Sequence, residues 1–369
     1  MHPSRTVTVD APSGRSRIEL GRGLRRHLGE RMSAAGLAPA RVALVRDGGV
    51  PGALVAEVRA GIGVPMVDVA VPGGEASKSL ESLASVAARM LDGGIDRAGA
   101  VVAVGGGAVG DLAGFAAATF MRGIPCVQVP TTLLAMVDAS VGGKSAVNLV
   151  RGDGSIAKNM IGAIVQPPLV VVDPECLATL PPRELRSGLA ECVKHAVIAD
   201  EPMLGWIEAR ADAIRAADPE TLLELVDRNV RIKASVVAGD ERDDGVRATL
   251  NLGHTFAHAI ESRMHADCTH GEAVAIGLVA ACRLAGALGA AGAGALEGRV
   301  RAALAAVGLP AALPVPRPAQ DLRAAMASDK KRRGGAPRLV VPFAVGDVRT
   351  GVTAPDGAVD EAWRAVGAT

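Results

Sequence analysis

The stretch VVAVGGGAVGDLAG, residues 101–114, decides the fold class, because an apolar strand runs directly into glycines and then into a helical pattern. Gly105, Gly107 and Gly110 have the GxGxxG spacing, in which glycines let backbone N–H groups approach a pyrophosphate at a helix N-terminus. The stretch lies about 100 residues into the chain, and no acidic residue ends the next strand, PCVQVP at 125–130. It therefore does not match the first unit of an ordinary Rossmann fold. A tight strand-to-helix turn without a ligand is the alternative.

Strand and helix patterns alternate on both sides of this stretch. Short β-rich runs bounded by glycine and proline occur at 41–47, 65–71 and 168–173, and apolar residues at helical spacing occur at 79–91 and 111–121. Such alternation predicts right-handed βαβ units and a parallel sheet.

The sequence changes character after PPRE at 181–184. Long stretches rich in Ala, Leu, Glu and Arg follow, and only RLVVPFAVGDV at 338–348 suggests a late pair of strands. We therefore expect an α/β domain with a Rossmann-like parallel sheet at 1–173 and a helical domain at 174–369.

Composition narrows the class of protein. The chain has 369 residues, a net charge of +1 and few aromatic side chains, four Phe and two Trp with no Tyr. A balanced charge gives no basic surface for nucleic acid or for a membrane, and the run KKRR at 330–333 is interpreted as a solvated loop. Five cysteines without a CxxC pair argue against a disulfide framework and a thiolate zinc site. No apolar run reaches the length of a membrane span, so we expect a soluble cytoplasmic protein.

Two neighbouring stretches place lysines and amides beside glycines. PTTLLAMVDASVGGKSAVN at 130–148 superficially resembles a phosphate-binding loop at SVGGKS, but the glycine that a Walker A motif requires is missing. A glycine turn presenting Lys144 remains, followed by Lys158 and Asn159 in KNMIG. Lysine with an amide indicates an anion pocket, and a solvated loop is the alternative.

A third stretch, GLAECVKHAVI at 188–198, carries Glu191 and Lys194 on an apolar helix. A surface ion pair is the simplest interpretation of the i, i+3 spacing. The apolar surroundings favour burial instead, and buried charges need a metal, an anion or a partner.

Four histidines cluster in the second half. In NLGHTFAHAIE at 251–261, His254 and His258 share one face of a helix, but Thr255 stands where the HExxH zinc motif has its glutamate, which excludes a metalloprotease of that type. Two histidines from this region with Glu191 as the carboxylate would leave coordination positions open, as catalytic zinc requires. Spacing alone does not choose the ligands among His254, His258, His265 and His270, and each could also be a structural histidine.

Taken in order, these motifs resemble those of the sugar-phosphate cyclases, and among them the 3-dehydroquinate synthase family. The resemblance runs from about residue 40 to residue 348. It rests on GGGAVGDLAGFAAATFMRG, VPTTLLAMVDASVGGKSAVN, AKNMIGAIVQP, TLPPRELRSGLAECVKH, NLGHTFAHAIE, HGEAVAIG and DKK. It implies an N-terminal NAD-binding α/β domain, an all-α metal-binding C-terminal domain, an active site between them and a homodimer.

The resemblance also implies roles for individual residues. The ligands of Zn²⁺ or Co²⁺ would be Glu191, His254 and His270. The positions that match NAD contacts are Asp47, Glu75, Lys78, Gly105, Gly106, Gly107, Asp111, Thr131, Thr132, Asp138, Lys144, Lys158, Cys176, Thr179, Leu180 and Glu184. The positions that match substrate or catalytic contacts are His258, Lys194, Lys144, Asn159, Arg247, Asn251, Asp138, Lys233, Arg122 and Lys331, with Lys330 as the alternative to Lys331. Arg122 would act in the partner subunit's site. One departure concerns the adenosine side, where Gly49 replaces an Asn that the family often has.

The reaction implied is conversion of 3-deoxy-D-arabino-heptulosonate 7-phosphate to 3-dehydroquinate and phosphate. This is a carbon–oxygen lyase step of the shikimate pathway, which leads to chorismate and the aromatic amino acids, and NAD is reduced and reoxidised within each turnover. Lys144, Asn159 and Arg122 would hold the phosphate, and Arg247 and Lys233 the carboxylate. The alternatives are a cyclase acting on sedoheptulose 7-phosphate or glucose 6-phosphate, which lack a carboxylate, and a metal-dependent polyol dehydrogenase, which would reduce NAD on balance. A degenerate, non-catalytic binding subunit is disfavoured because Glu191, His254 and His270 are all present.

Overall fold

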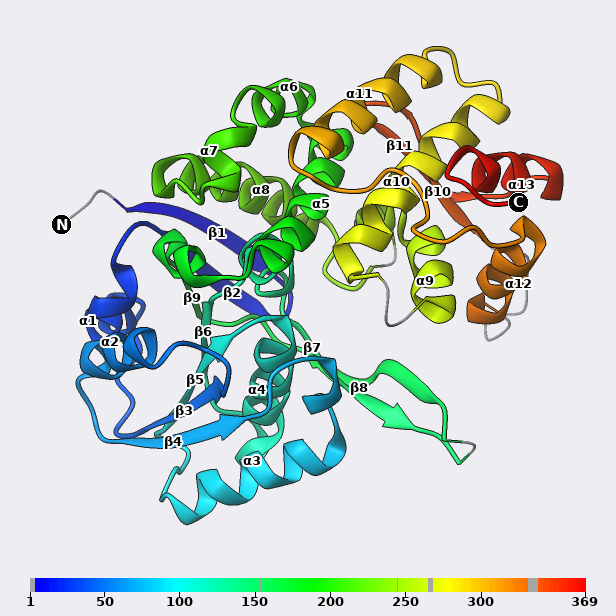
Figure 1. Ribbon diagram of the computed structural model, residues 1–369. Helices are drawn as coiled ribbons and strands as arrows, with labels where there is room; N and C mark the ends of the chain where they lie inside the picture. The colour runs from blue at the N-terminus through cyan, green and yellow to red at the C-terminus, as the bar shows by residue number, and fades with distance from the viewer. Residues whose placement is uncertain (1–3, 153, 244, 265–267, 331–337) are drawn as a thin grey trace. The chain divides into compact units, whose positions relative to one another are not determined.

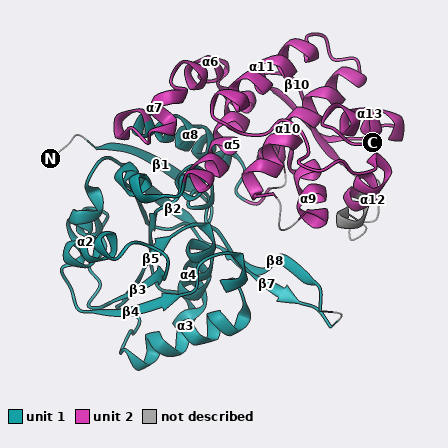
Figure 2. Ribbon diagram, viewed as in Figure 1, with its two compact units in different colours: residues 1–181, 222–241 teal, residues 182–221, 242–369 magenta. Residues whose placement is uncertain are grey.

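A computed structural model describes residues 4–152, 154–243, 245–264, 268–330 and 338–369. The chain forms two compact units, drawn in teal and magenta in Figure 2. The first comprises residues 1–181 and 222–241, and the second comprises residues 182–221 and 242–369. The domain boundary after residue 173 stays a prediction. The units differ from it in assigning two segments to the α/β unit, residues 174–181 and residues 222–241, the second of which is most of a long helix.

The first unit is built on a seven-stranded sheet in the order β1-β2-β9-β6-β5-β3-β4 (Figure 1). Its strands are β1 (Arg5–Ala11), β2 (Gly14–Leu20), β3 (Val42–Asp47), β4 (Met66–Val71), β5 (Ala100–Gly105), β6 (Cys126–Pro130) and β9 (Leu169–Val172). All neighbours pair in parallel except β1 and β2, which form an antiparallel hairpin that the sequence analysis did not predict. The five parallel strands predicted from apolar runs are confirmed.

Helices cover this sheet because their apolar faces need burial. They are α1 (Leu28–Ala34), α2 (Gly52–Ile62), α3 (Leu80–Asp92), α4 (Gly107–Thr119) and α8 (Pro219–Gly239), of which residues 219–221 belong to the second unit. The core between α3, α4 and the sheet consists mainly of Val and Ala with some Leu, Ile and Met, together with Cys126 and the buried Phe115. An Ala-rich α4 can approach β5 closely, which brings its N-terminus to the glycine turn.

Two further strands of this unit form a separate antiparallel sheet, β7 (Lys144–Val150) and β8 (Ile156–Ile164). In Figure 1 this hairpin extends away from the seven-stranded sheet. The sequence predicts a glycine turn that presents Lys144 here, with a solvated loop as the alternative. The turn is present, with Gly142 and Gly143 at positive φ, but the residues after it are a strand.

The second unit is mainly helical. Its helices are α5 (Pro182–Ala199), α6 (Glu201–Ala209), α7 (Ala211–Arg215), α9 (His254–Arg263), α10 (His270–Ala287), α11 (Ala293–Ala306), α12 (Ala319–Lys330) and α13 (Asp356–Ala365). The late strand pair is confirmed as β10 (Leu339–Ala344) and β11 (Asp347–Val352). Helix α10 is almost entirely buried and packs against α5, α9, α11 and α13. In the described residues, no helix is long and apolar enough to cross a membrane.

Candidate functional site

Three side chains from three helices converge in the second unit. Glu191 lies in the middle of α5, His254 is the first residue of α9, and His270 is the first residue of α10. One ligand atom from each lies within 4.8 Å of the others. The Nε2 atoms of His254 and His270 are 3.6 and 3.8 Å from Glu191 Oε1. The structure therefore brings together the three residues that the sequence predicts as metal ligands.

Glycines at helix crossings make this convergence possible. A Cβ at Gly271 would overlap the backbone of Ser187 in α5, and a Cβ at Gly277 would overlap the Gly253 carbonyl that precedes α9. Gly253 also has a φ of 78°, in the left-handed region that favours glycine. Because these positions lack side chains, α10 lies directly against α5 and against the start of α9.

Each histidine is oriented through its other ring nitrogen. His270 Nδ1 is 3.0 Å from Glu261 Oε1, and His254 Nδ1 is 3.2 Å from the Leu252 carbonyl oxygen. Such contacts fix the ring plane and leave Nε2 as the atom available to a metal. Both Nε2 atoms lie on the side of Glu191, which is the arrangement a cation bound by two imidazoles and one carboxylate needs.

The electrostatics of the cluster fit a cation. Glu191 is fully buried, and neither of its carboxylate oxygens has a hydrogen bond of ordinary geometry from the described residues. Burial would raise the pKa of Glu191, but the Lys194 ammonium and the imidazoles hold it well below its ordinary value. Burial and the Lys194 charge lower the pKa of His254 to about 3, which leaves its ring neutral. Burial would lower the pKa of His270 too, but the Glu191 and Glu261 carboxylates raise it to about 10, so a metal would replace its proton.

The other predicted residues of this unit differ in how exposed they are to solvent. Lys194 is buried and forms an ion pair with Glu191. His258 is exposed, and its ring centre is 5.8 Å from that of His254 in an edge-on arrangement. The 3₁₀ helix Val246–Asn251 carries a buried Arg247 and an exposed Asn251. Lys331 lies outside the described residues.

The first unit gathers its predicted residues at the carboxyl ends of β3, β5 and β6. A Cβ at Gly105 would lie 3.0 Å from the Asp47 Cβ, and a Cβ at Gly106 would lie 3.2 Å from a Thr132 methyl group. The Thr131 N–H donates to the Gly105 carbonyl at 2.9 Å. Strands β4 and β6 continue the sheet on opposite sides of the β3–β5 pair, so this edge is the topological switch point at which open α/β sheets bind ligands. Gly107 begins α4 there, and the free backbone N–H groups at a helix N-terminus are suited to bind an anion.

A polar network lies beside the glycine turn. Lys78 Nζ donates to Asp111 Oδ2 at 2.6 Å and to Asn159 Oδ1 at 2.5 Å, and Glu75 Oε1 is 3.6 Å from the same ammonium. Burial raises the pKa of Asp111 to about 6, although Lys78 opposes this shift. Lys233 of α8 pairs with Asp138 at 2.6 Å, so the predicted residues of this unit include two pairs of opposite charge.

The remaining predicted site residues belong to neither the metal cluster nor the polar network beside the glycine turn. Lys144 and Lys158 are exposed on β7 and β8, and Arg122, with a φ of 71°, follows α4. Cys176, Thr179 and Leu180 lie on or directly after the 3₁₀ helix Pro174–Thr179. Glu184 is in the first turn of α5, in the second unit.

Two residues with structural contacts to the sites were not among the predicted site residues. Glu261 supports His270, and it is seven residues after His254, a spacing that places both on one helix face. Asn148 ends the stretch at 130–148, and it contacts Glu75 and Asn159. These contacts depend on the pairing of β7 with β8 and on the approach of residue 75, so no spacing pattern could reveal them.

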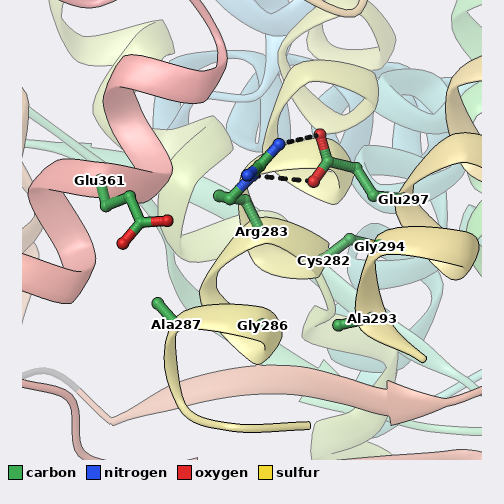
Figure 3. Close-up of a pocket in the computed structure, with 8 residues that line it drawn as sticks. All are labelled: Cys282, Arg283, Gly286, Ala287, Ala293, Gly294, Glu297 and Glu361. Carbon is green, nitrogen blue, oxygen red and sulfur yellow. Dashed lines mark hydrogen bonds and ion pairs between the residues drawn. The ribbon is translucent and has the colours of Figure 1, made fainter. Parts of the chain in front are cut away.

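A separate hollow of about 380 Å³ lies among α10, α11 and α13 (Figure 3). Arg283 of α10 and Glu297 of α11 form two close contacts across it, at 2.9 and 3.2 Å. Glu297 also pairs with Arg301 at 2.9 Å. Because Glu297 pairs with both arginines and so joins α10 to α11, we interpret the hollow as a helix junction and assign it no chemistry.

Comparison with known families decides where the chain belongs. The family description "3-dehydroquinate synthase N-terminal" matches residues 68–187, and "3-dehydroquinate synthase C-terminal" matches residues 188–332. The chain belongs to the 3-dehydroquinate synthase family.

Relatives of this family are similar over most of their length. The 3-dehydroquinate synthase of Symbiobacterium thermophilum is 45% identical over 93% of this chain and 92% of its own. That of Halorhodospira halophila is 50% identical over 85% of this chain and 87% of its own. Among solved structures, a 2-deoxy-scyllo-inosose synthase complexed with carbaglucose-6-phosphate, NAD⁺ and Co²⁺ superimposes with a TM-score of 0.88 at 26% identity, covering 98% of this chain and 99% of that one. The two-domain fold expected for the 3-dehydroquinate synthase family is thus confirmed.

Proposed function

We propose that the chain converts 3-deoxy-D-arabino-heptulosonate 7-phosphate to 3-dehydroquinate and phosphate, using NAD and a divalent metal ion. The observation that carries this proposal is the convergence of Glu191, His254 and His270 with Glu261 behind them. The chain that holds this cluster is 45–50% identical to two 3-dehydroquinate synthases over most of its length. The 2-deoxy-scyllo-inosose synthase, a cyclase of another name, is more distant, at 26% identity.

We assign Glu191, His254 and His270 as the ligands of Zn²⁺ or Co²⁺. Two imidazole nitrogens and one carboxylate leave coordination positions for substrate oxygens, which distinguishes a catalytic from a closed structural site. When bound, the cation lowers the pKa of the substrate hydroxyls that it holds, and NAD accepts a hydride and returns it. The solved inosose synthase, which contains NAD⁺ and Co²⁺, supports this pairing of cofactors.

The NAD side of the site is assigned to the first unit. Gly105, Gly106 and Gly107 leave backbone N–H groups open to the pyrophosphate, and Thr131 and Thr132 follow the adjoining strand β6. Lys78, fixed by Asp111, contributes a positive charge at the same edge. The positions Asp47, Glu75, Asp138, Lys144, Lys158, Cys176, Thr179, Leu180 and Glu184 complete the proposed contacts.

Proton transfer and anion binding are assigned to the remaining polar groups. His258 is exposed next to His254, so it can exchange a proton with substrate and with solvent. Lys194 forms an ion pair with Glu191, and its ammonium can stabilise negative charge that develops on a substrate oxygen. We assign Lys144, Asn159 and Arg122 to the phosphate and Arg247 and Lys233 to the carboxylate, with Asp138, Asn251 and Lys331 as further substrate contacts.

We also propose a cytoplasmic homodimer in which Arg122 reaches the partner's site. The hairpin of β7 and β8 supports the dimer, because it exposes Val150, Ile156 and Met160 by 62, 62 and 55%. Grouped apolar side chains on a two-stranded sheet are typical of a surface that another chain covers. The five free, buried cysteines are in keeping with a reducing compartment.

The test is turnover of the seven-carbon keto acid phosphate with NAD and Zn²⁺. Phosphate release without accumulation of NADH is expected, since the hydride returns to the substrate in each cycle. Sedoheptulose 7-phosphate, which lacks the carboxylate, should release no phosphate. Release from that sugar alone would replace the assignment by another cyclase, and net NADH formation would replace it by a polyol dehydrogenase.

A ligand variant tests the metal part of the assignment. His270→Ala should lose both bound metal and turnover, because one of three protein ligands is removed. Metal content at the wild-type level in this variant would show that the ligand set is wrong.

A further inference from the structure

The second strand of the β7–β8 hairpin contains an irregularity opposite one residue. Val147 pairs with Ile161 while Leu149 pairs with Ala157, so Asn148 alone faces residues 158–160. Bulges of this kind change the direction of a side chain and occur next to active sites. Here the bulge contains Lys158 and Asn159, both of which the proposed function uses.

Asn159 has a backbone conformation that needs support. Its φ is 55°, in the left-handed region, which asparagine tolerates better than most residues but which still costs about 1 kcal/mol. Its N–H donates to the side-chain oxygen of Asn148 at 2.8 Å, in place of a partner in the strand ladder. The Asn159 side chain then accepts from Lys78 at 2.5 Å.

The other end of the Asn148 amide holds a different segment. Its Nδ2 donates to Glu75 Oε1 at 2.9 Å, and the Asn148 backbone N–H donates to the Lys78 carbonyl at 2.8 Å. Asn148 is itself buried, at 8% exposure. One side chain thus links the segment that carries Glu75 and Lys78 to the bulge that carries Asn159.

We infer that Asn148 is a positioning residue that sets the distance between the NAD-side pair Glu75 and Lys78 and the substrate-side Asn159. The inference rests on the proposed function for the roles of those three residues. An amide is required because one end must accept from a backbone N–H and the other must donate to a carboxylate. Leucine does neither, and aspartate can only accept.

The test separates the two ends of the amide. In Asn148→Asp, the acceptor for Asn159 remains, but a carboxylate faces Glu75, so the KM for NAD should rise about tenfold while the KM for substrate changes less than about twofold. In Asn148→Leu, both KM values should rise about tenfold, because both contacts are lost.

Gln166 supplies matched controls within the same unit. It is a buried amide, and its Nε2 donates to Glu241 at 2.9 Å, the same chemistry with a carboxylate to which the proposed function gives no role. Gln166→Glu and Gln166→Leu should lower the melting temperature and leave both KM values unchanged. If they reproduce the KM pattern, or if both Asn148 variants keep wild-type KM values, Asn148 has no positioning role.

A measurement without turnover separates this inference from the proposed function. Hydrogen–deuterium exchange of the segment around Asn159 should be faster than wild type in Asn148→Leu and unchanged in Asn148→Asp. An inactive wild-type protein would refute the proposed function but leave this result readable. Equal exchange in wild type and Asn148→Leu would overturn the inference whatever the activity.

Discussion

Glu261 shows how a residue outside the ligand set can control a metal site. Its carboxylate holds Nδ1 of His270, and a histidine whose other nitrogen meets a carboxylate is a more basic and better-oriented ligand. Glu261→Gln should lower metal affinity about 10- to 100-fold, measured by competition with a chelator dye.

The control for that prediction is Glu272, which lies two residues after His270 on α10. Glu272 completes a capping box with Thr269 and pairs with Arg183, but it does not contact the His270 ring in the described structure. Glu272→Gln should cost up to about 1 kcal/mol of unfolding free energy and keep metal affinity. An equal loss of affinity in both variants would mean that helix position, not the Glu261 contact, sets metal binding.

Asp111 makes stability depend on pH. Burial raises its pKa from 3.8 to about 6, so between these values the folded state holds a proton that the unfolded state releases. This contribution is fully present below pH 4 and is lost as pH rises through 6, by roughly 1–3 kcal/mol. Asp111→Asn should therefore gain stability relative to wild type as pH rises over that window, measured by urea unfolding of the protein without NAD.

Lys78 provides the complementary variant. Its ammonium lowers the pKa of Asp111, so Lys78→Gln should raise that pKa further and extend the pH window upward. If the difference between Asp111→Asn and wild type stays constant with pH, Asp111 is ionised throughout and the burial argument is wrong.

At the scale of elements, close helix packing is expected to matter more than helix propensity. A glycine inside a helix is normally improved by alanine, by roughly 0.5–1 kcal/mol. At Gly271 the added methyl group would overlap the Ser187 backbone, so Gly271→Ala should instead cost about 1–3 kcal/mol and weaken metal binding by moving α10 from α5.

Gly298 on α11 is the matched control, because open space surrounds its position. Gly298→Ala should be neutral or slightly stabilising in thermal unfolding, with metal content unchanged. A stabilised Gly271→Ala protein with full metal content would show that the helix crossing is not tight.

The sequence predicted five of the strands that pair in parallel, because these five are short runs of mostly apolar residues. Four of them, β3, β5, β6 and β9, are largely buried, and the edge strand β4 is only partly buried. The β7–β8 hairpin was missed because residues such as Lys144, Asn148 and Lys158 interrupt any alternation of apolar and polar side chains. Its strand character comes from pairing with a partner and from packing on α4, which only the folded chain reveals.

The candidate site was predictable to a similar degree. Long motifs pointed to Glu191, His254 and His270, but spacing did not distinguish these histidines from His258. The structure places Nε2 of His254 and His270 toward Glu191 and leaves His258 exposed. Asn148 and Glu261 act through neighbours that the sequence cannot rank, since hydrogen-bond partners depend on tertiary contacts.

At the scale of the whole molecule, the dimer proposal predicts that two defective proteins can restore each other. Arg122→Ala and His258→Ala should each lose most turnover as homodimers, because one lacks a phosphate contact and the other a proton-transfer group. If Arg122 acts across the interface, the site of the Arg122→Ala subunit in a mixed dimer has its own His258 and receives the intact Arg122 of its partner. The other site of that dimer lacks both.

Mixing the two variants after reversible dissociation therefore measures whether Arg122 acts in its own subunit or in the partner. Random reassociation makes about half of the dimers mixed, each with one working site, so about a quarter of wild-type activity should return. If Arg122 serves its own subunit, every site in the mixture lacks one of the two residues and no activity returns. A control mixture of Arg122→Ala with the ligand variant His270→Ala should recover to the same extent, since the restored site again takes the metal from one subunit and the arginine from the other.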